Sequence, residues 1–365
     1  MLCCPLSTWS WHCEVIEIGF FKRHTLWLLT AALVLLVLVA ATIGSIYISP
    51  LQVLGILVHR LSELPAPMVA DWPESYETII LSIRLPRVVL ALVVGAALAL
   101  AGAIFQGLFK NPMADPHIIG ASAGAGLGAA MAITMGLSIN WKGLGAVPLL
   151  ASIGALLAVI LVYRLARSGG VVPIPNLLLA GLALNSLLSA LISLLIYFGQ
   201  DQMHTIVFWL MGGLSGRYWN YVFYTLPYLL IGVGAAVYYA RDLNLMLLGE
   251  ETAHNLGVEV EKVKAVLLLV ASVLTGAAVA ASGMIGFVGL IVPHVARILV
   301  GPDHRRLVPV SVLSGAILLL GADILARTVL APVELPLGVV TALFGAPFFI
   351  MLLRRTGGHF TEAGD

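Results

Sequence analysis

Long apolar runs separated by short polar segments dominate the chain from residue 26 onward. A helix that crosses a membrane needs about 20 mostly apolar residues, and ten runs approach that length. We predict spans at 26–48, 87–109, 118–138, 147–166, 175–198, 219–240, 264–283, 286–300, 307–328 and 336–353. The eighth run is short and contains Pro293, so we expect it to be broken or to cross only partly.

The composition supports this pattern. The chain is 60% hydrophobic and 10% charged, and its mean hydropathy is +1.04. Soluble domains carry about 25% charged residues, so an ordinary soluble protein is excluded. A net charge of +1 also gives no field that would hold a nucleic acid. We therefore predict an all-α polytopic membrane protein with about ten transmembrane helices and membrane lipid around it.

Charge predicts the orientation of these spans. If the N-terminus is cytoplasmic, thirteen of the 19 Lys and Arg residues fall on the cytoplasmic side, as expected for cytoplasmic loops. Both termini are then cytoplasmic, in a multi-pass protein of the cytoplasmic membrane. We predict a tail at 1–24 that is disordered or a mis-assigned start, a single transmembrane domain at 25–355, and a cytoplasmic tail at 356–365.

Three segments fall outside the predicted spans. Residues 50–86 read as an outer loop with several prolines, and 205–216 as a short helix near the outer surface. Residues 243–264 have mixed charge and helical spacing. Within them, Glu250 and Glu251 suit a helix start and Gly257 its stop. This helix either meets a cytoplasmic partner protein or forms a simple connection.

Two spans share a sequence pattern. Residues 95–104 read GAALALAGAI and residues 276–285 read GAAVAASGMI. The two spans lie five apart and so run in opposite directions, which indicates the internal inverted repeat found in many transporters. A chance match between Gly- and Ala-rich helices is the alternative.

Few polar side chains interrupt the spans. Asp323 and Arg327, four residues apart, can form an ion pair on one helix face, or Arg327 can serve docking. Asn185, Ser189 and Ser193 share one face of the fifth span and indicate either helix packing or a translocation path. The glycines of 120–128 predict close helix packing.

No catalytic, cofactor or metal motif is present. The sequence lacks a Gly-x-x-x-x-Gly-Lys-Ser/Thr loop for ATP phosphates, a His-Glu-x-x-His pair and any clustered Cys/His motif. We therefore expect a protein that is not an enzyme and that holds no cofactor and no metal.

The chain resembles the permease subunits of ABC importers for iron–siderophore complexes, haem and cobalamin. The resemblance runs in order from about residue 84 to 355. It rests on RLPR (84–87), the run 95–107 ending in FQG, NPMADP (111–116), LGEETAHNLG (248–257), GFVGLIVPHVAR (286–297), DHR (303–305) and ELPLGVVTALFGAP (334–347). Residues 1–23 match no part of the family pattern.

The resemblance implies the type II ABC importer fold: a homodimer with its pore at the subunit interface, two ATPase subunits and an extracytoplasmic substrate-binding protein. It implies that the segment 243–264 contacts the ATPase, which hydrolyses the ATP, and that outer arginines meet acidic side chains of the binding protein. The matching positions are, for ATPase coupling, Gly249, Glu250, Ala253, Leu256 and Gly257; for docking, Arg84, Arg87 and Arg327; and for the pore, Asn185, Ser189 and Ser193.

We therefore predict a permease that moves a metal chelate, above all an iron–siderophore complex, with haem or cobalamin as alternatives. A secondary transporter driven by an ion gradient is a competing hypothesis. The scarcity of carboxylates within the spans argues against it. An intramembrane enzyme is a further alternative, which no nucleophile–base pair supports.

Overall fold

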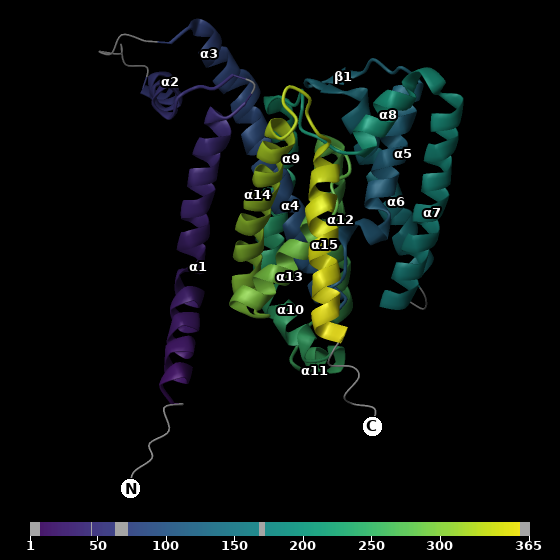
Figure 1. Ribbon diagram of the computed structural model, residues 1–365. Coiled ribbons are helices and arrows are strands. Elements are labelled where there is room, and N and C mark those ends of the chain that lie inside the picture. Colours follow the sequence, from purple (N-terminus) through teal and green to yellow (C-terminus); the bar gives the residue numbers. More distant parts are fainter. Residues whose placement is uncertain (1–7, 45, 63–71, 168–171, 358–365) are drawn as a thin grey trace.

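The computed structural model describes residues 8–44, 46–62, 72–167 and 172–357, and the fold is a helical bundle (Figure 1). A short antiparallel hairpin, formed by the two-residue strands β1 (Asn140–Trp141) and β2 (Leu144–Gly145), connects α5 to α6. The α-helices are α1 (Thr8–Thr42), α2 (Pro50–Ser62), α3 (Glu74–Thr78), α4 (Leu85–Leu108), α5 (Ala121–Thr134), α6 (Ala146–Ala166), α7 (Ile174–Phe198), α8 (Met203–Leu210), α9 (Trp219–Tyr238), α10 (Ala240–Leu247), α11 (Glu250–Asn255), α12 (Val260–Ser282), α13 (Val288–Val300), α14 (His304–Thr328) and α15 (Leu337–Gly357).

Each predicted span coincides with one helix. In the described part of the chain, seven helical stretches are long and apolar enough to cross a membrane, and three shorter apolar helices, α5, α13 and α15, complete the set. The predicted short span is α13, with 13 residues and Pro293 inside it. At 1.5 Å per residue it is about 20 Å long, which is less than the thickness of the hydrocarbon core.

The bundle has two distinct ends (Figure 1). One carries α10 and α11, and there α1 begins and α15 ends; we call it the α11 end. The opposite end carries α2, α8 and the hairpin, and we call it the β1 end. The predicted short helix of 205–216 is present as α8, Met203–Leu210.

Three segments predicted outside the spans contain helix. Helix α1 already begins at Thr8, so most of the tail predicted at 1–24 is helical, while 1–7 lie outside the described residues. Likewise α15 continues to Gly357, two residues into the tail predicted at 356–365; residues 358–365 lie outside the described part. The predicted loop at 50–86 instead holds α2, α3 and a π-helical stretch, η1 (Ile79–Arg84), that runs directly into α4.

Helix α4 is the centre of the bundle. Of its most apolar 18-residue window, 89% is buried, against 22% for α1 and for α7. It packs against α9, α12, α13 and α14. A helix that is apolar on all sides needs such surroundings, so the remaining spans are arranged around it.

The two repeat segments occupy equivalent places in the bundle. Gly95 of α4 lies so close to Gly315 of α14 that a Cβ would overlap its carbonyl oxygen, and Gly276 of α12 lies against Ala155 of α6. Thus α4 packs on α13 and α14, while α12 packs on α5 and α6. This exchange of partners is the arrangement that an inverted repeat predicts.

The glycines of 120–128 pack helix against helix, as predicted. A Cβ on Gly124 would overlap the carbonyl oxygen of Gly154 in α6, and a Cβ on Gly154 would overlap that of Gly124. Gly128 approaches Leu150 in the same way. In lipid, where apolar burial does not drive association, such close backbone contact holds α5 to α6.

Candidate functional site

At the β1 end, Arg84 holds the end of the first span. It stands at the junction of η1 and α4 and is 5% exposed. Its guanidinium donates to the carbonyl oxygens of Ala41 at 2.9 Å and Thr42 at 3.0 Å, and also to that of Ile46. The last carbonyls of a helix have no partner within it and favour a cation. Arg84 therefore caps α1.

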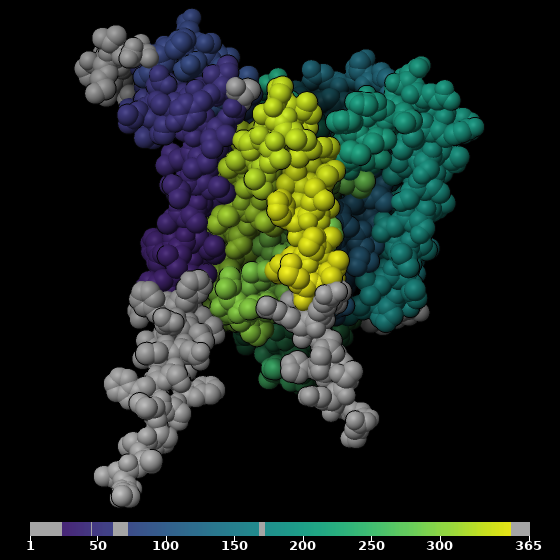
Figure 2. All heavy atoms as spheres, viewed as in Figure 1, coloured from purple at the N-terminus to yellow at the C-terminus, as the bar shows by residue number. Residues whose placement is uncertain are grey.

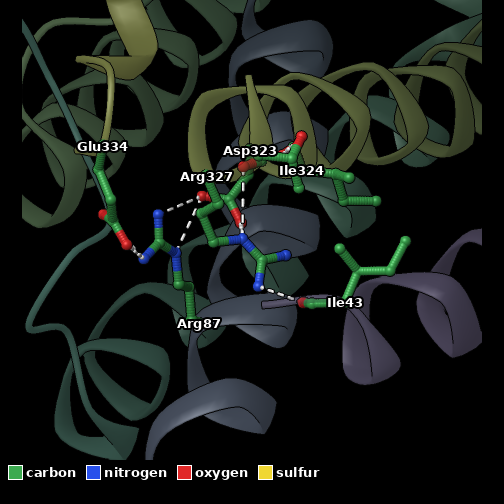
Figure 3. A network of polar contacts seen from close by, with 7 residues as sticks. Ile43, Arg87, Asp323, Ile324, Arg327 and Glu334 are labelled. Atoms are coloured by element: carbon green, nitrogen blue, oxygen red, sulfur yellow. Dashed lines mark hydrogen bonds and ion pairs between the residues drawn. The ribbon is translucent and has the colours of Figure 1, made fainter. Parts of the chain in front are cut away.

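A buried ion-pair network lies beside this cap (Figure 3). Asp323 of α14, whose side chain is 1% exposed, lies between two arginines. Arg87 of α4 meets its Oδ1 through Nε at 3.0 Å and Nη2 at 2.9 Å. Arg327 meets its Oδ2 through Nε at 3.1 Å and donates from Nη1 to the carbonyl oxygen of Ile43 at 3.2 Å. The network thus joins α1, α4 and α14.

Glu334 completes the network from the loop between α14 and α15. Its two carboxylate oxygens accept hydrogen bonds from Nη1 of Arg87 at 2.8 and 3.0 Å, and 40% of its side chain is exposed. Desolvation alone would raise the pKa of Glu334, but the hydrogen bond and charge of Arg87 outweigh it and lower the pKa below its usual value. The positive charges of the two arginines therefore equal the negative charges of the two carboxylates in this network.

The structure brings the three predicted docking residues to one end but leaves their side chains largely enclosed. Arg87 exposes 12% of its side chain and Arg327 exposes 7%. The predicted Asp323–Arg327 ion pair is confirmed. The burial of Arg84 and its contacts with three carbonyls do not fit the predicted role at a docking surface. Docking through Arg87 and Arg327 stays a prediction.

At the α11 end, the predicted coupling residues surround one short helix. Gly249 links α10 to α11 with a φ of +129°, which strongly favours glycine, and Gly257 follows α11 with a φ of +86°. Glu250 accepts a hydrogen bond from Nζ of Lys264 in α12 at 2.6 Å. Ala253 is fully buried, so it anchors α11 to the bundle and does not lie on the surface that a partner would meet.

The solvent-facing surface around α11 presents apolar side chains. Leu248 is 69% exposed and Leu256 is 55% exposed, and Gly257 is exposed between α11 and α12. In Figure 1, α11 lies below the lower ends of α7, α14 and α15. Exposed apolar side chains grouped on one face mark an interaction surface more often than isolated ones do.

A polar junction connects α10 to α14. Asn244 donates from Nδ2 to Oδ1 of Asp303 at 2.6 Å, and its Oδ1 accepts from the backbone N of His304 at 2.9 Å. Asp303 also caps α14 by accepting from the backbone N of Arg305 at 3.0 Å. That hydrogen bond is the main reason why the pKa of Asp303 lies below its usual value. These hydrogen bonds therefore link α10 directly to the start of α14.

Asn244 and its two partners were missed as site residues by sequence reasoning. The DHR segment at 303–305 signalled Asp303 and His304, because it is part of the family resemblance. No pattern in the sequence singles out Asn244, because its partner lies 59 residues away. His304 is 1% exposed and lies against Gly107 at the end of α4, so the junction also reaches the central helix.

The predicted pore residues are spread along α7. Asn185 is partly buried and donates from Nδ2 to the carbonyl oxygens of His117 at 3.2 Å and Ile118 at 3.1 Å, which lie in the short 3₁₀ helix η2 (Pro116–Ile119). Ser189 and Ser193 are exposed in the single chain. Asn185 thus has a packing role, and a pore role for all three stays a prediction.

A cleft lies between α15 and α7 (Figure 2). It is closed at the β1 end, where the backbone N of Gly338 in α15 donates to the carbonyl oxygen of Met211, directly after α8, at 3.0 Å. Beside it lies an apolar depression of about 570 Å³, lined by Leu210, Met284, Val339 and Leu343 among others. Among the described residues, no group of three or more His, Cys, Asp and Glu side chains is placed to hold a metal ion.

The sequence matches the FecCD transport family over residues 32–355. The chain belongs to this family. Its FecCD relatives include the cobalamin import system permease protein BtuC of Halobacterium salinarum, 47% identical over 79% of this chain and 77% of that protein. The hemin transport system permease protein HmuU of Yersinia pestis is 45% identical over 75% and 83%. FecD of Escherichia coli, an Fe(3+) dicitrate transport system permease protein, is 39% identical over 82% and 94%.

A solved structure supports the same assignment of fold. A metal-chelate type ABC transporter in an inward-facing conformation matches 91% of this FecCD chain and 99% of its own, with a TM-score of 0.78 and 32% identity. The chain is therefore a multi-pass membrane protein with the fold of an ABC transporter permease, as the sequence predicted.

Proposed function

We propose that this FecCD chain is the permease subunit of an ABC importer that moves a metal chelate, above all an iron–siderophore complex, across the cytoplasmic membrane. The similarity to the metal-chelate transporter over 91% of the chain carries the proposal. Relatives named for Fe(3+) dicitrate, hemin and cobalamin match three quarters or more of this chain. They support chelates as the substrate class and leave haem and cobalamin as alternatives.

In this proposal the α11 end faces the cytoplasm and receives two ATPase subunits, one for each copy of the chain. Leu256, Gly257 and Glu250 form the contact, Gly249 shapes the turn, and Ala253 fixes the helix beneath it. The exposed apolar side chains there support such a contact. Hydrolysis of ATP belongs to the partner subunit.

The β1 end then faces outward and receives the substrate-binding protein. Arg87 and Glu334 are the parts of the buried network nearest to solvent. Carboxylates of the binding protein would meet Arg87 and Arg327 there. Charge pairs of this kind fix the orientation of the partner more than they add affinity.

The pore lies between two copies of the chain in this proposal. The exposed faces of α7 and α15 beside the cleft support this placement, with Asn185, Ser189 and Ser193 along α7. The permease alternates between outward and inward openings. ATP binding favours one of them only through different contacts with the two states, which α10 and α11 would supply through Asn244 and Asp303.

Reconstituted transport tests the proposal. Proteoliposomes holding the chain, an ATPase subunit and a binding protein from the same organism are offered labelled ferric siderophore, haem and cobalamin. We expect uptake of one chelate that stops without ATP and without the binding protein. Transport by the chain alone under an imposed ion gradient, with no ATP-dependent uptake, would instead show a secondary transporter.

A further inference from the structure

A second apolar groove lies on the opposite side of α15 from the cleft. It holds about 690 Å³ and is formed by α1, α14 and α15 together with the start of α13. Val39, Ile291, Leu318 and Phe348 are among its lining residues. Figure 2 looks onto this side of the molecule, where α1, α14 and α15 lie side by side.

Water has no means of filling this groove. The lining side chains are apolar except for Thr341, whose hydroxyl already donates to the carbonyl oxygen of Gly338 at 3.1 Å. A buried water needs about three polar partners. The groove therefore offers no stable place for water.

The groove also lies at the depth of the membrane. Two of its walls, α1 and α14, are candidate spans, and its lining residues on α14 are 317–325, inside the span of residues 304–328. It continues the apolar surface that faces lipid, since Leu35 of α1 and Phe344 of α15 are each 64% exposed. The groove therefore lies within the membrane-spanning part of the chain, where we expect lipid hydrocarbon beside it.

The walls of the groove are held at one end. Arg84 and Arg327 fix the end of α1 to α4 and α14 through backbone carbonyls, while only 22% of the apolar window of α1 is buried. A hydrocarbon chain in the groove between α1 and α14 would make dispersion contacts with both helices and would bury no polar group.

We propose that this groove binds an acyl chain of a membrane lipid and that the bound chain stabilises the packing of α1 on α14. Gly321 gives a direct test, because it lines the groove and a Cβ there would meet no atom within 4 Å. The variant Gly321→Phe therefore fills the groove from within. Gly234 of α9 is the matched control, since it is exposed and a Cβ there also meets no atom within 4 Å.

Photolabelling measures the occupancy. The full chain is placed in nanodiscs with a phosphatidylethanolamine that carries a diazirine in mid-chain, and adducts are mapped by peptide mass spectrometry. We expect enriched adducts on the groove residues of α1 and α14 relative to α9. Gly321→Phe lowers them about tenfold, since filling the groove removes the burial of about two methylene groups, whereas Gly234→Phe leaves them unchanged.

Thermal unfolding gives a second readout that a folding defect would not imitate. After delipidation in detergent, Gly321→Phe should unfold at a higher temperature than the wild type, and added phosphatidylethanolamine should raise the Tm of the wild type only. Three results would each overturn the proposal. The first is equal labelling of α9 and the groove, and the second is labelling of the groove that Gly321→Phe does not change. The third is a disulfide-linked dimer of Leu318→Cys, which would show that a second copy covers this face.

Discussion

Asn244 of α10 is hydrogen-bonded to Asp303, the residue that caps α14, at 2.6 Å. This contact joins the helices at the α11 end to a membrane-spanning helix by side chains and not only by the chain itself. Helix α14 carries Asp323 and Arg327 near its other end. One helix therefore connects the proposed ATPase surface with the buried network at the β1 end.

Asn244→Leu should weaken both stability and coupling. The change leaves Asp303 and His304 without their partner, and a hydrogen bond to a charged group contributes about 1.5–3 kcal/mol. We expect the free energy of unfolding to fall by about that amount and uptake per ATP hydrolysed to fall in proteoliposomes. Asn140→Leu, which removes only a hydrogen bond within the exposed turn of the hairpin at the β1 end, serves as control. Undiminished uptake per ATP would contradict the linkage.

Asp323→Asn should be far more damaging than Glu334→Gln. Removing the Asp323 charge leaves Arg327 without its carboxylate and Arg87 with Glu334 alone, and breaking a buried ion pair in this way costs about 3–5 kcal/mol. Glu334 is 40% exposed, so its pair contributes about 0–1 kcal/mol. Unfolding by denaturant in detergent measures both variants. Equal losses would mean that Asp323 is not the centre of the network.

The contact between Arg87 and Glu334 should be sensitive to acid. The pKa of folded Glu334 lies below its usual value, so its stabilisation is present above the unfolded pKa and is lost as pH falls through the folded one. The difference in Tm between wild type and Glu334→Gln should be constant near neutral pH and should shrink as the pH falls below the unfolded pKa of glutamate, about 4.3. A difference that persists or grows at low pH would refute this.

Gly124→Leu should separate α5 from α6. The new side chain overlaps the carbonyl oxygen of Gly154, and overpacking of this kind costs about 1–3 kcal/mol or more. Gly234→Leu, where the added atoms meet open space, should unfold like the wild type. Measurement of Tm in detergent distinguishes the two, and equal Tm values would show that the close contact is dispensable.

Sequence patterns predicted the features that depend on residues close together in the chain. Runs of about 20 apolar residues located the spans, and the spacing of four located the Asp323–Arg327 pair. The loop prediction at 50–86 failed because two of its prolines stand at helix starts: Pro50 begins α2 and Pro73 directly precedes α3. Proline is favoured at such positions because its missing N–H needs no partner there.

Sequence patterns did not predict contacts between segments that lie far apart in the chain. Arg84 was predicted at a docking surface, yet its carbonyl partners lie about 40 residues earlier, at the end of α1. Arg87 finds Asp323 236 residues away. Such pairs depend on which spans lie side by side, and periodicity within one helix carries no such information. Ala253 was predicted as a contact residue from the family pattern alone, which does not show its burial.

The ATPase activity of the assembled transporter tests most directly whether α11 transmits the action of the ATPase. Two variants, Glu250→Arg and Gly257→Trp, alter this surface. The first also breaks the ion pair with Lys264 of α12, and the second places a side chain at a φ of +86°. We predict that both insert and fold, and that both lose the increase in ATP hydrolysis that the substrate-loaded binding protein causes in the wild type. An increase of wild-type size in both variants would contradict the account.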